Sequence, residues 1–338
     1  MQFKNWYDKN YKKLLVLPAI VLTLSIIYLG FFYTQNQDVI YRDVSLTGGT
    51  TITIFTQTSI AELEQALEGK LPSIDIRALS DNTGKQNRLV VTAPEEQEDL
   101  LKQELEDFLG EPLTEKNSSQ ESTSASLSAN FYKQLIIAVI LAFFWMAAVV
   151  FLIFAKGGKI KFWVVLINIL FGFFLGMFFL TINTYIATII FLAFAIGLIY
   201  IYIKNSVPAF AVMLSAFADI IMTLALVDLL GFKISTAGLV AFLMLIGYSV
   251  DTDILLTTRM LRKQQDSDNA LFSAFKTGTT MTLTSIIAVT AALMVVYSFG
   301  TVLNQIFSIL IIGLCFDLFN TWITNASLIK WYTAEKNA

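Results

Sequence analysis

The sequence predicts a polytopic α-helical membrane protein that carries one α+β domain outside the bilayer. Hydrophobic residues make up 56% of the 338 residues and charged residues only 14%, against about 25% charged residues in soluble domains. The apolar residues gather in runs of roughly 18 or more, which is long enough to cross a bilayer core of about 30 Å. Between the first and second runs lies a polar, acidic stretch, residues 34–132.

Eight runs are long and apolar enough to span the membrane. They are residues 14–33, 133–154, 162–181, 185–203, 208–230, 236–258, 281–300 and 306–330. The first run follows several lysines and could be mistaken for a signal peptide. It is longer than a typical signal core and no small-residue cleavage site follows it, so we expect an uncleaved span.

The distribution of basic residues predicts the orientation, because Lys and Arg accumulate near span ends on the cytoplasmic side. With the N-terminus inside, the basic residues of the inner loops and the C-terminus are Lys156, Lys159, Lys161, Lys204, Arg259, Arg262, Lys263, Lys276, Lys330 and Lys336. Apart from the large domain at 34–132 and its junction with the second span, the outside loops hold only Lys233 near a span. We therefore expect a plasma-membrane protein with both termini cytoplasmic and residues 34–132 extracytoplasmic.

The extracytoplasmic stretch alternates between strand and helix patterns. Strands are expected at 50–55, 74–79 and 88–92, and helices at 59–71 and from Pro94 to about Gly110. Ser59 with Glu62 three residues later forms a capping box. Residues 118–128 could be a linker or an exposed closing strand. The order β-α-β-β-α, with a closing strand, predicts a ferredoxin-like fold.

Several function classes are excluded or disfavoured by composition. The chain has no histidine, which rules out a histidine metal site or proton relay, and its net charge of −3 offers no basic face for nucleic acid. The lone cysteine, Cys315, cannot form a disulfide within the chain. Phosphate-binding glycine loops and catalytic triads are absent. We therefore expect neither an enzyme nor a cofactor.

Asp219 is the most informative residue, because it lies near the middle of the fifth span. An aspartate at the bilayer centre costs about 2.5–3.5 kcal/mol, so it should face the bundle interior with a partner. Ala211, Ser215 and Thr223 share its helix face. Removal from water disfavours the ionised carboxylate, so Asp219 could exchange protons near neutral pH. The alternative is a protonated carboxyl that only holds helices together.

The sixth span carries two further acids, Asp251 and Asp253, followed by Arg259. At about 1.5 Å per residue, Asp219 lies roughly 16 Å and Asp251 roughly 12 Å from the cytoplasmic ends of their helices. The two carboxyls could therefore form a coupled pair, or a chain could run inward through Asp253 to Arg259. The alternatives are a simple ion pair of Asp253 with Arg259, or an Arg259 side chain that extends to the headgroups.

The last two spans hold the secondary polar candidates. Asp317 shares a stripe with Gly313, Thr321 and Asn325, which we expect to pack inward. Thr284 belongs to a threonine-rich start of the seventh span, where packing is a simpler role than substrate binding. Asp228 lies near the outer interface, where a charge costs little, and receives no role.

Four stretches resemble the SecF branch of the SecD/SecF family, in the resistance-nodulation-division superfamily, and most closely its archaeal type. They are residues 43–50 (DVSLTGGT, with Asp43, Gly48 and Gly49), 215–219 (SAFAD), 247–250 (GYSV, with Gly247, Tyr248 and Ser249) and 277–285 (TGTTMTLTS). Residues 251–253 read Asp-Thr-Asp where many members have Asn-Asp-Thr, so either Asp251 or Asp253 takes the family role.

The resemblance implies partnership with a SecD-like subunit, a SecY-type channel, membrane lipid and translocating polypeptide. It also implies use of the proton or ion gradient, with Asp219 and Arg259 at the coupling positions. The family has six spans, so residues 156–204 would add a helix pair within a bundle of about seven helices at 133–338. Rival interpretations are a superfamily transporter for lipid or small hydrophobic molecules, and a structural scaffold of the channel complex.

Overall fold

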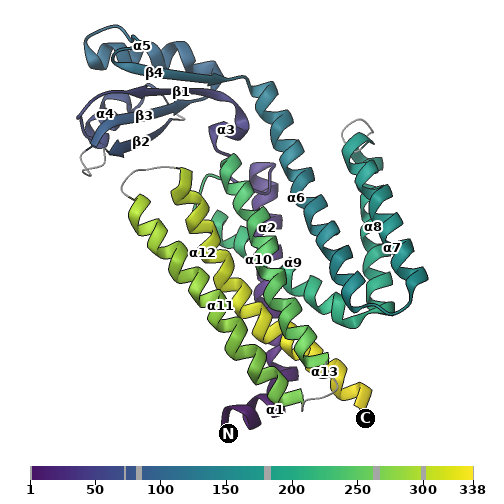
Figure 1. Cartoon of the computed structure of the whole chain (residues 1–338). Coiled ribbons are helices and arrows are strands. Elements are labelled where there is room, and N and C mark those ends of the chain that lie inside the picture. The colour runs from purple at the N-terminus through teal and green to yellow at the C-terminus, as the bar shows by residue number, and fades with distance from the viewer. Residues whose placement is uncertain are drawn as a thin grey trace.

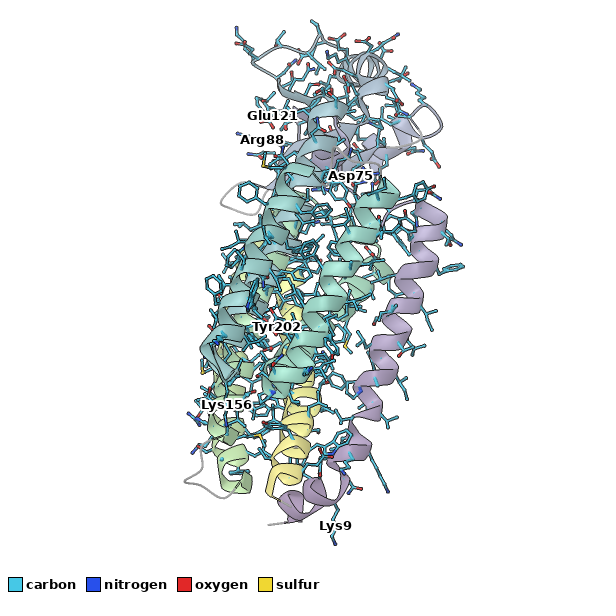
Figure 2. The ribbon with its side chains drawn as sticks, turned by 90° about the vertical axis from the view of Figure 1, so that its right-hand side faces the viewer. Lys9, Asp75, Arg88, Glu121, Lys156 and Tyr202 are labelled. Atoms are coloured by element: carbon cyan, nitrogen blue, oxygen red, sulfur yellow. The ribbon has the colours of Figure 1, made fainter. Side chains whose placement is uncertain are left out.

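A computed structural model describes residues 2–71, 74–80, 86–178, 184–261, 267–297 and 302–337. A long helical bundle carries a small α+β unit at one end, and both chain termini lie at the opposite end (Figure 1). In a second view, Lys9 and Lys156 lie toward the end with the termini, whereas Asp75, Arg88 and Glu121 lie at the α+β end (Figure 2).

Within the described residues, eight helical segments are long and apolar enough to cross a membrane, as the sequence predicts. The helices outside the α+β unit are α1 (Gln2–Leu14), α2 (Val16–Asn36), α6 (Ala125–Phe154), α7 (Gly158–Phe173), η2 (Phe174–Phe178), α8 (Thr184–Asn205), α9 (Val207–Leu229), α10 (Thr236–Leu261), α11 (Ser267–Val296), α12 (Val302–Asn320), η4 (Thr321–Asn325) and α13 (Ala326–Asn337).

The helical segment that carries the seventh span begins before residue 281 and runs Ala270–Val296. The first turns of this helix are rich in threonine. Some of these threonine side chains pack inside the bundle, and others donate hydrogen bonds to backbone carbonyls of the same helix. Thr282 is buried, and Thr280 donates to the carbonyl of Lys276 at 2.7 Å. Because such hydroxyls satisfy themselves within the helix, a polar stretch does not end a membrane helix.

The α+β unit has the expected β-α-β-β-α-β order and closes with a fourth strand. Its elements are α3 (Val44–Thr47), β1 (Gly49–Ile54), α4 (Ile60–Leu67), β2 (Asp75–Ser80), β3 (Gln86–Ala93), η1 (Glu95–Gln97), α5 (Glu98–Leu109) and β4 (Ser118–Thr123). The strands run antiparallel in the order β2-β3-β1-β4. The predicted ferredoxin-like arrangement is confirmed, and β4 resolves the open choice between a linker and a strand. The sequence also predicts a turn at 81–84, between β2 and β3, and this segment lies outside the described residues.

One face of this sheet packs on α4 and α5 (Figure 1). Ile52, Ile54 and Leu89 from the strands meet Leu63 and Leu101 from the two helices, and all five are fully buried. The hydroxyl of Ser59 accepts a hydrogen bond from the amide of Glu62 at 3.3 Å, as the capping-box pattern predicts. A separate hydrophobic core therefore holds the unit together.

In the bundle, α9 and α10 are the central helices. Within the apolar window of each span, 61% of the α9 residues and 56% of the α10 residues are buried, against 17% for α8. Helix α12 packs against both α9 and α10, whereas α7 and α8 form a hairpin to one side (Figure 1). Polar side chains on the inward faces of α9, α10 and α12 therefore meet away from lipid.

Candidate functional site

The inward stripe predicted on α9 is buried along its length. Ala211, Ser215, Asp219 and Thr223 are each at most 1% exposed. Ser206 caps the N-terminus of α9, with its hydroxyl accepting from the amide of Ala209 at 3.3 Å. The geometric expectation for Asp219, an interior carboxyl with polar neighbours, is confirmed.

Both oxygens of the Asp219 carboxyl accept a hydrogen bond from another helix. Ser249 on α10 donates its hydroxyl to Oδ2 at 2.5 Å. Asn320 at the end of α12 donates from Nδ2 to Oδ1 at 2.7 Å. Through these two hydrogen bonds, Asp219 on α9 joins α10 and the end of α12 at one point.

A second carboxyl, Asp253 on α10, is fully buried within electrostatic reach of Asp219. Asn325 donates from Nδ2 to its Oδ1 at 2.8 Å, while its Oδ2 atom makes no hydrogen bond. The hydroxyl of Ser215 faces this carboxyl without forming a hydrogen bond of normal geometry.

Asp317 on α12 supplies the third carboxyl, and it is 1% exposed. Thr321 donates to its Oδ1 at 3.3 Å, and its Oδ2 makes no hydrogen bond. Asp317 lies within electrostatic reach of both Asp219 and Asp253. We call Asp219, Asp253 and Asp317 the carboxyl cluster.

A π-helical turn, η4, interrupts the last span beside the carboxyl cluster. It begins at Thr321 and ends at Asn325, the two residues that donate to Asp317 and Asp253. Isolated π-turns inside helices occur often at functional sites. Here the two hydrogen-bond donors, Thr321 and Asn325, are the first and last residues of the π-helical turn, and both side chains reach the carboxyl cluster.

Comparisons with known proteins agree on one family. A family model described as protein export membrane protein SecD/SecF, C-terminal, matches residues 175–335. A protein-export membrane protein SecF from Methanocaldococcus jannaschii is 34% identical over 337 residues, which is 98% of each chain. The chain belongs to the SecF family of protein-export membrane proteins.

Further relatives support this membership. The SecF protein of Pyrococcus furiosus is 29% identical over 96% of this chain and 92% of its own. In three dimensions, the whole chain matches 39% of a crystal structure of SecDF, a translocon-associated membrane protein, from Thermus thermophilus, with a TM-score of 0.57 and 15% identity. That likeness shows a shared fold. Membership in the SecF family makes this chain a multi-pass membrane protein and a SecF-type accessory subunit of protein export.

The predicted pairing of Asp219 with Asp251 is wrong. Asp251 is exposed on the outer face of α10, whereas Asp253 is the acid that lies close to Asp219. Successive helix residues are 100° apart at 3.6 residues per turn. Residues two positions apart, such as Asp251 and Asp253, therefore point to nearly opposite sides of the helix. Of the two acids in this SecF chain, the packing brings Asp253 into the cluster.

Arg259 also lies apart from the carboxyl cluster. Its Nη1 donates to the carbonyl of Ser273 at 2.7 Å, to the Ser273 hydroxyl at 3.0 Å and to the Thr277 hydroxyl at 3.0 Å. The predicted ion pair of Asp253 with Arg259 is therefore wrong for the described residues, whereas the chain through Asp253 and a side chain extended to headgroups stay predictions. Arg259 instead ties α10 to α11.

Two other sequence candidates take outward positions. Thr284 is exposed and donates to the carbonyl of Met281 in its own helix at 2.8 Å. Tyr248 is 46% exposed, and Gly247 beside it is exposed as well. Of the 247–249 motif, only Ser249 points into the bundle.

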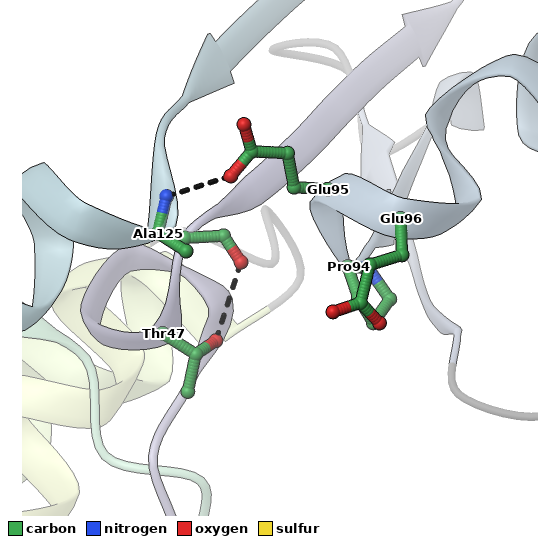
Figure 3. A pocket seen from close by; sticks show the side chains of 6 residues that line it. Thr47, Pro94, Glu95, Glu96 and Ala125 are labelled. Carbon is green, nitrogen blue, oxygen red and sulfur yellow. Dashed lines mark hydrogen bonds between the residues drawn. The ribbon is translucent and has the colours of Figure 1, made fainter.

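The glycine motif near Asp43 lies where the α+β unit meets the bundle. Gly48 and Gly49 both have positive φ, at 84° and 152°. A hollow of about 590 Å³ at this joint is lined by Thr47, Gly48, Pro94, Glu95, Glu96 and Ala125. Within it, the Glu95 carboxylate accepts from the first amide of α6, at Ala125, at 2.8 Å (Figure 3).

Glu98, on the helix-covered face of the sheet, was not singled out by the sequence. Its carboxylate accepts from Lys102 at 2.7 Å, Gln120 at 2.9 Å, Ser122 at 3.1 Å and the Thr50 hydroxyl. Hydrogen bonds from Lys102 and Thr50 lower the pKa of Glu98 to about 2. These donors come from α5, β1 and β4, so one carboxylate joins three elements.

Asp228 departs from its expectation, because it is only 2% exposed near the outer end of α9. Its neighbours include the backbone of Tyr41 and the carboxylate of Asp38. The sequence alone does not reveal this burial, because residues 38–43 cover Asp228 only after the chain has folded back from α2.

Proposed function

We propose that this SecF-type subunit couples an ion gradient to polypeptide export through the Asp219 carboxyl. The observation that carries the proposal is that Asp219 lies fully buried and accepts hydrogen bonds from two other helices. Intramembrane carboxyls that face a bundle interior mark ion and proton pathways by default.

The chemistry follows from the two donors. An ionised Asp219 holds both Ser249 and Asn320 as hydrogen-bond donors. A proton on either oxygen removes one acceptor position and the charge that strengthens the other bond. Gaining or losing a proton therefore changes how tightly α9 is held to α10 and to the end of α12.

A continuous set of contacts leads from these helices to the α+β unit. The loop between α9 and α10 pairs with the segment after α2, since the Ile234 amide donates to Tyr41 at 2.6 Å and Asp43 donates its amide to Ile234 at 2.9 Å. Arg77 on β2 then meets Asp43 at 3.6 Å and Asp75 at 2.7 Å. Movement of the α9–α10 loop would shift the sheet through these contacts.

In this proposal the chain has three parts: residues 1–33, an extracytoplasmic domain at 34–132, and a bundle at 133–338. Both termini face the cytoplasm, as the basic loops favour, and the α+β unit handles emerging polypeptide on the far side. The helix pair within 156–204 would contact lipid or a partner through its large exposed apolar side chains.

The exposed face of α10 supports a membrane partner. Val240, Met244, Gly247, Tyr248 and Asp251 form this outward stripe. A carboxylate facing lipid costs about 2.5–3.5 kcal/mol near the bilayer centre, so a neighbouring helix that offers a hydrogen-bond donor or a cation would stabilise Asp251. We infer that a SecD-like subunit covers this stripe and that a SecY-type channel delivers the polypeptide.

The test replaces Asp219 with asparagine in the complex with its partner subunits and channel. Asp219→Asn keeps the shape and an acceptor oxygen but cannot be ionised, so we expect gradient-dependent export to be lost while assembly is retained. Asp228→Asn is the matched control, since it removes a buried carboxyl from the same helix outside the cluster. Normal gradient-dependent export by Asp219→Asn would refute the coupling.

Two rival functions give different results in the same preparation. A purely structural scaffold predicts that Asp219, Asp253 and Asp317 each tolerate asparagine. A lipid or small-molecule transporter predicts a homo-oligomer that retains bound lipid, whereas the export subunit should co-purify with SecD-like and channel proteins.

A further inference from the structure

We propose that Gln305 is a positioning residue that links α12 to the loop between α9 and α10, so that this loop moves with α12. The inference rests on the proposed coupling through Asp219 and adds α12 to the route by which that coupling reaches the α+β unit. Gln305 lies in the first turn of α12, and the loop comprises residues 230–235.

Both ends of the Gln305 side-chain amide bind the loop. Its Oε1 atom accepts from the backbone amide of Ser235 at 3.0 Å and from the Ser235 hydroxyl at 2.5 Å. Its Nε2 atom donates to the carbonyl of Lys233. A backbone N–H only donates and a carbonyl only accepts, so these three hydrogen bonds fix the orientation of the Gln305 amide.

Ser235 caps the N-terminus of α10. Its hydroxyl accepts from the amide of Gly238 at 3.3 Å, which is the geometry of a helix N-cap. Ser235 is only 7% exposed, so its polar groups need partners within the protein. Gln305 also comes close to the first turn of α10, because a Cβ atom at Gly238 would lie 2.8 Å from its Oε1 atom. The start of α10 is therefore held to the start of α12.

The same loop is bound to the chain that enters the α+β unit. The amide of Ile234 donates to the carbonyl of Tyr41 at 2.6 Å, and the amide of Asp43 donates to the carbonyl of Ile234 at 2.9 Å. The amide of Thr236, the first residue of α10, donates to the Ser45 hydroxyl at 3.3 Å. These partners lie within α3 or just before it, and β1 follows directly. The loop therefore connects α12 with the sheet.

Helix α12 can carry a displacement from the carboxyl cluster to this loop. It runs without interruption from Val302 to Asn320, and Asn320 donates to Asp219 Oδ1 at 2.7 Å. At about 1.5 Å per residue, Gln305 and Asn320 lie roughly 22 Å apart along the helix axis. Helices shift by about 1–2 Å in many conformational transitions, and such a shift would break the hydrogen bonds of Gln305 unless the loop followed. Because unpaired buried polar groups are costly, the loop follows α12.

Asn304, the neighbouring amide on α12, provides a matched control. Its Nδ2 atom donates to the carbonyl of Tyr297 at 3.1 Å, just after the end of α11. Asn304 and Gln305 are both half-buried, and each donates to a backbone carbonyl. Loss of the Asn304 side chain should therefore disturb the start of α12 without releasing the α9–α10 loop.

The experiment is a double-mutant cycle in the full chain, reconstituted in lipid vesicles at neutral pH. Spin labels at Glu121→Cys and Lys156→Cys, in a Cys315→Ala background, report the distance between the sheet and the end of the molecule that holds the termini (Figure 2). Asp219→Asn imitates the uncharged carboxyl. We expect it to shift this distance by about 1–2 Å, the scale of a helix displacement.

The shift caused by Asp219→Asn should be lost when Gln305→Leu is present, because the loop is then released from α12. It should remain when Asn304→Leu is present. A full shift in the Gln305→Leu protein, or no shift in a chain that retains Gln305, would overturn the inference.

Gln305→Glu guards against a folding defect in Gln305→Leu. It keeps the size of the side chain but sets a carboxylate oxygen against the Lys233 carbonyl, where neither group can donate. The shift should therefore shrink in this variant as well, and a full shift would also count against the link. Each protein is measured below its own melting temperature.

Export assays in the complex separate this inference from the coupling function. If Asp219→Asn abolishes gradient-dependent export while Gln305→Leu exports normally, the coupling stands and the Gln305 link is wrong. If Gln305 controls the shift but Asp219→Asn exports normally, the link stands and the coupling function is wrong.

Discussion

Gly48 packs directly against the backbone of Ala125, the first residue of the long helix α6. A Cβ atom at Gly48 would lie 2.4 Å from the Cα of Ala125 and 2.6 Å from its amide nitrogen. Residues 43–49 therefore touch the point where the chain passes from β4 into the membrane helix. Only glycine allows this approach, and its φ of 84° is also one that glycine adopts without strain.

Replacing Gly48 with alanine should loosen this joint. The left-handed conformation alone costs about 1–2 kcal/mol for a residue with a Cβ, and the clash with backbone adds about 1–3 kcal/mol. Gly69→Ala is the control, because Gly69 has a similar φ of 77° but open space around it. We expect the melting temperature in detergent to fall clearly more for Gly48→Ala. Equal losses would show that the contact with Ala125 does not matter.

Asn320→Ala should destabilise the bundle by leaving Asp219 Oδ1 without its donor. Loss of a hydrogen bond to a buried polar group costs about 1–3 kcal/mol. Asn205→Ala serves as control, since Asn205 is exposed and only bonds the carbonyl of Ile201 in its own helix. Thermal unfolding in detergent measures the difference. An Asn320→Ala protein as stable as Asn205→Ala would mean that Asp219 does not need this donor.

Glu98 should stabilise the α+β unit in a pH-dependent way. Its pKa falls from 4.5 to about 2 on folding, so its contribution is complete above 4.5 and is lost as the pH drops toward 2. At neutral pH, Glu98→Gln should lower the free energy of unfolding by about 1–2 kcal/mol. The gap from wild type should close in acid.

The control for Glu98 is Asp99→Asn, which changes an exposed neighbouring carboxylate. Chemical unfolding of the full chain is followed at several pH values between neutral and strongly acidic. A difference between wild type and Glu98→Gln that does not shrink as the pH falls would contradict the prediction.

Arg77→Gln should widen the range of orientations of the α+β unit relative to the bundle. Arg77 is 41% exposed, and such ion pairs contribute about 0–1 kcal/mol, so little stability should be lost. The measurement is the distance distribution between spin labels on the sheet and on α6. Arg88→Gln is the control. Arg88 is an arginine of the same sheet, but its guanidinium lies 4.9 Å from the ring centroid of Phe55 and takes no part in the ion pairs of Arg77. An unchanged distribution in Arg77→Gln would remove this link from the coupling route.

The orientation can be read from cysteine labelling, because the chain has a single cysteine. In a Cys315→Ala background, Glu121→Cys should react with an impermeant maleimide added to intact cells. Lys156→Cys should react only after the membrane is opened, since Glu121 lies on the α+β unit and Lys156 toward the opposite end of the molecule (Figure 2). The reverse labelling pattern would mean that the α+β unit faces the cytoplasm, and the proposed orientation would be wrong.

Much of the fold follows from local patterns. Runs of apolar residues specify the spans, because every backbone polar group in a bilayer must bond within its own helix. Alternating patterns and the Ser59 cap specify the β-α-β-β-α-β unit. The stripe from Ala211 to Thr223 places Asp219 inward by helix periodicity alone. Hydropathy did not predict that the helix of the seventh span starts before residue 281, because it does not register hydroxyls that bond to their own helix.

The sequence by itself determined that a carboxyl lies inside a membrane bundle and that an α+β domain follows the first span. Tertiary structure alone decided which residues meet that carboxyl. Asp253 instead of Asp251, Asn320 from about 100 residues away and Ser249 all reach the cluster through the rotation and packing of whole helices. Helix rotation depends on the combined fit of many side chains along each interface, and no local pattern contains it.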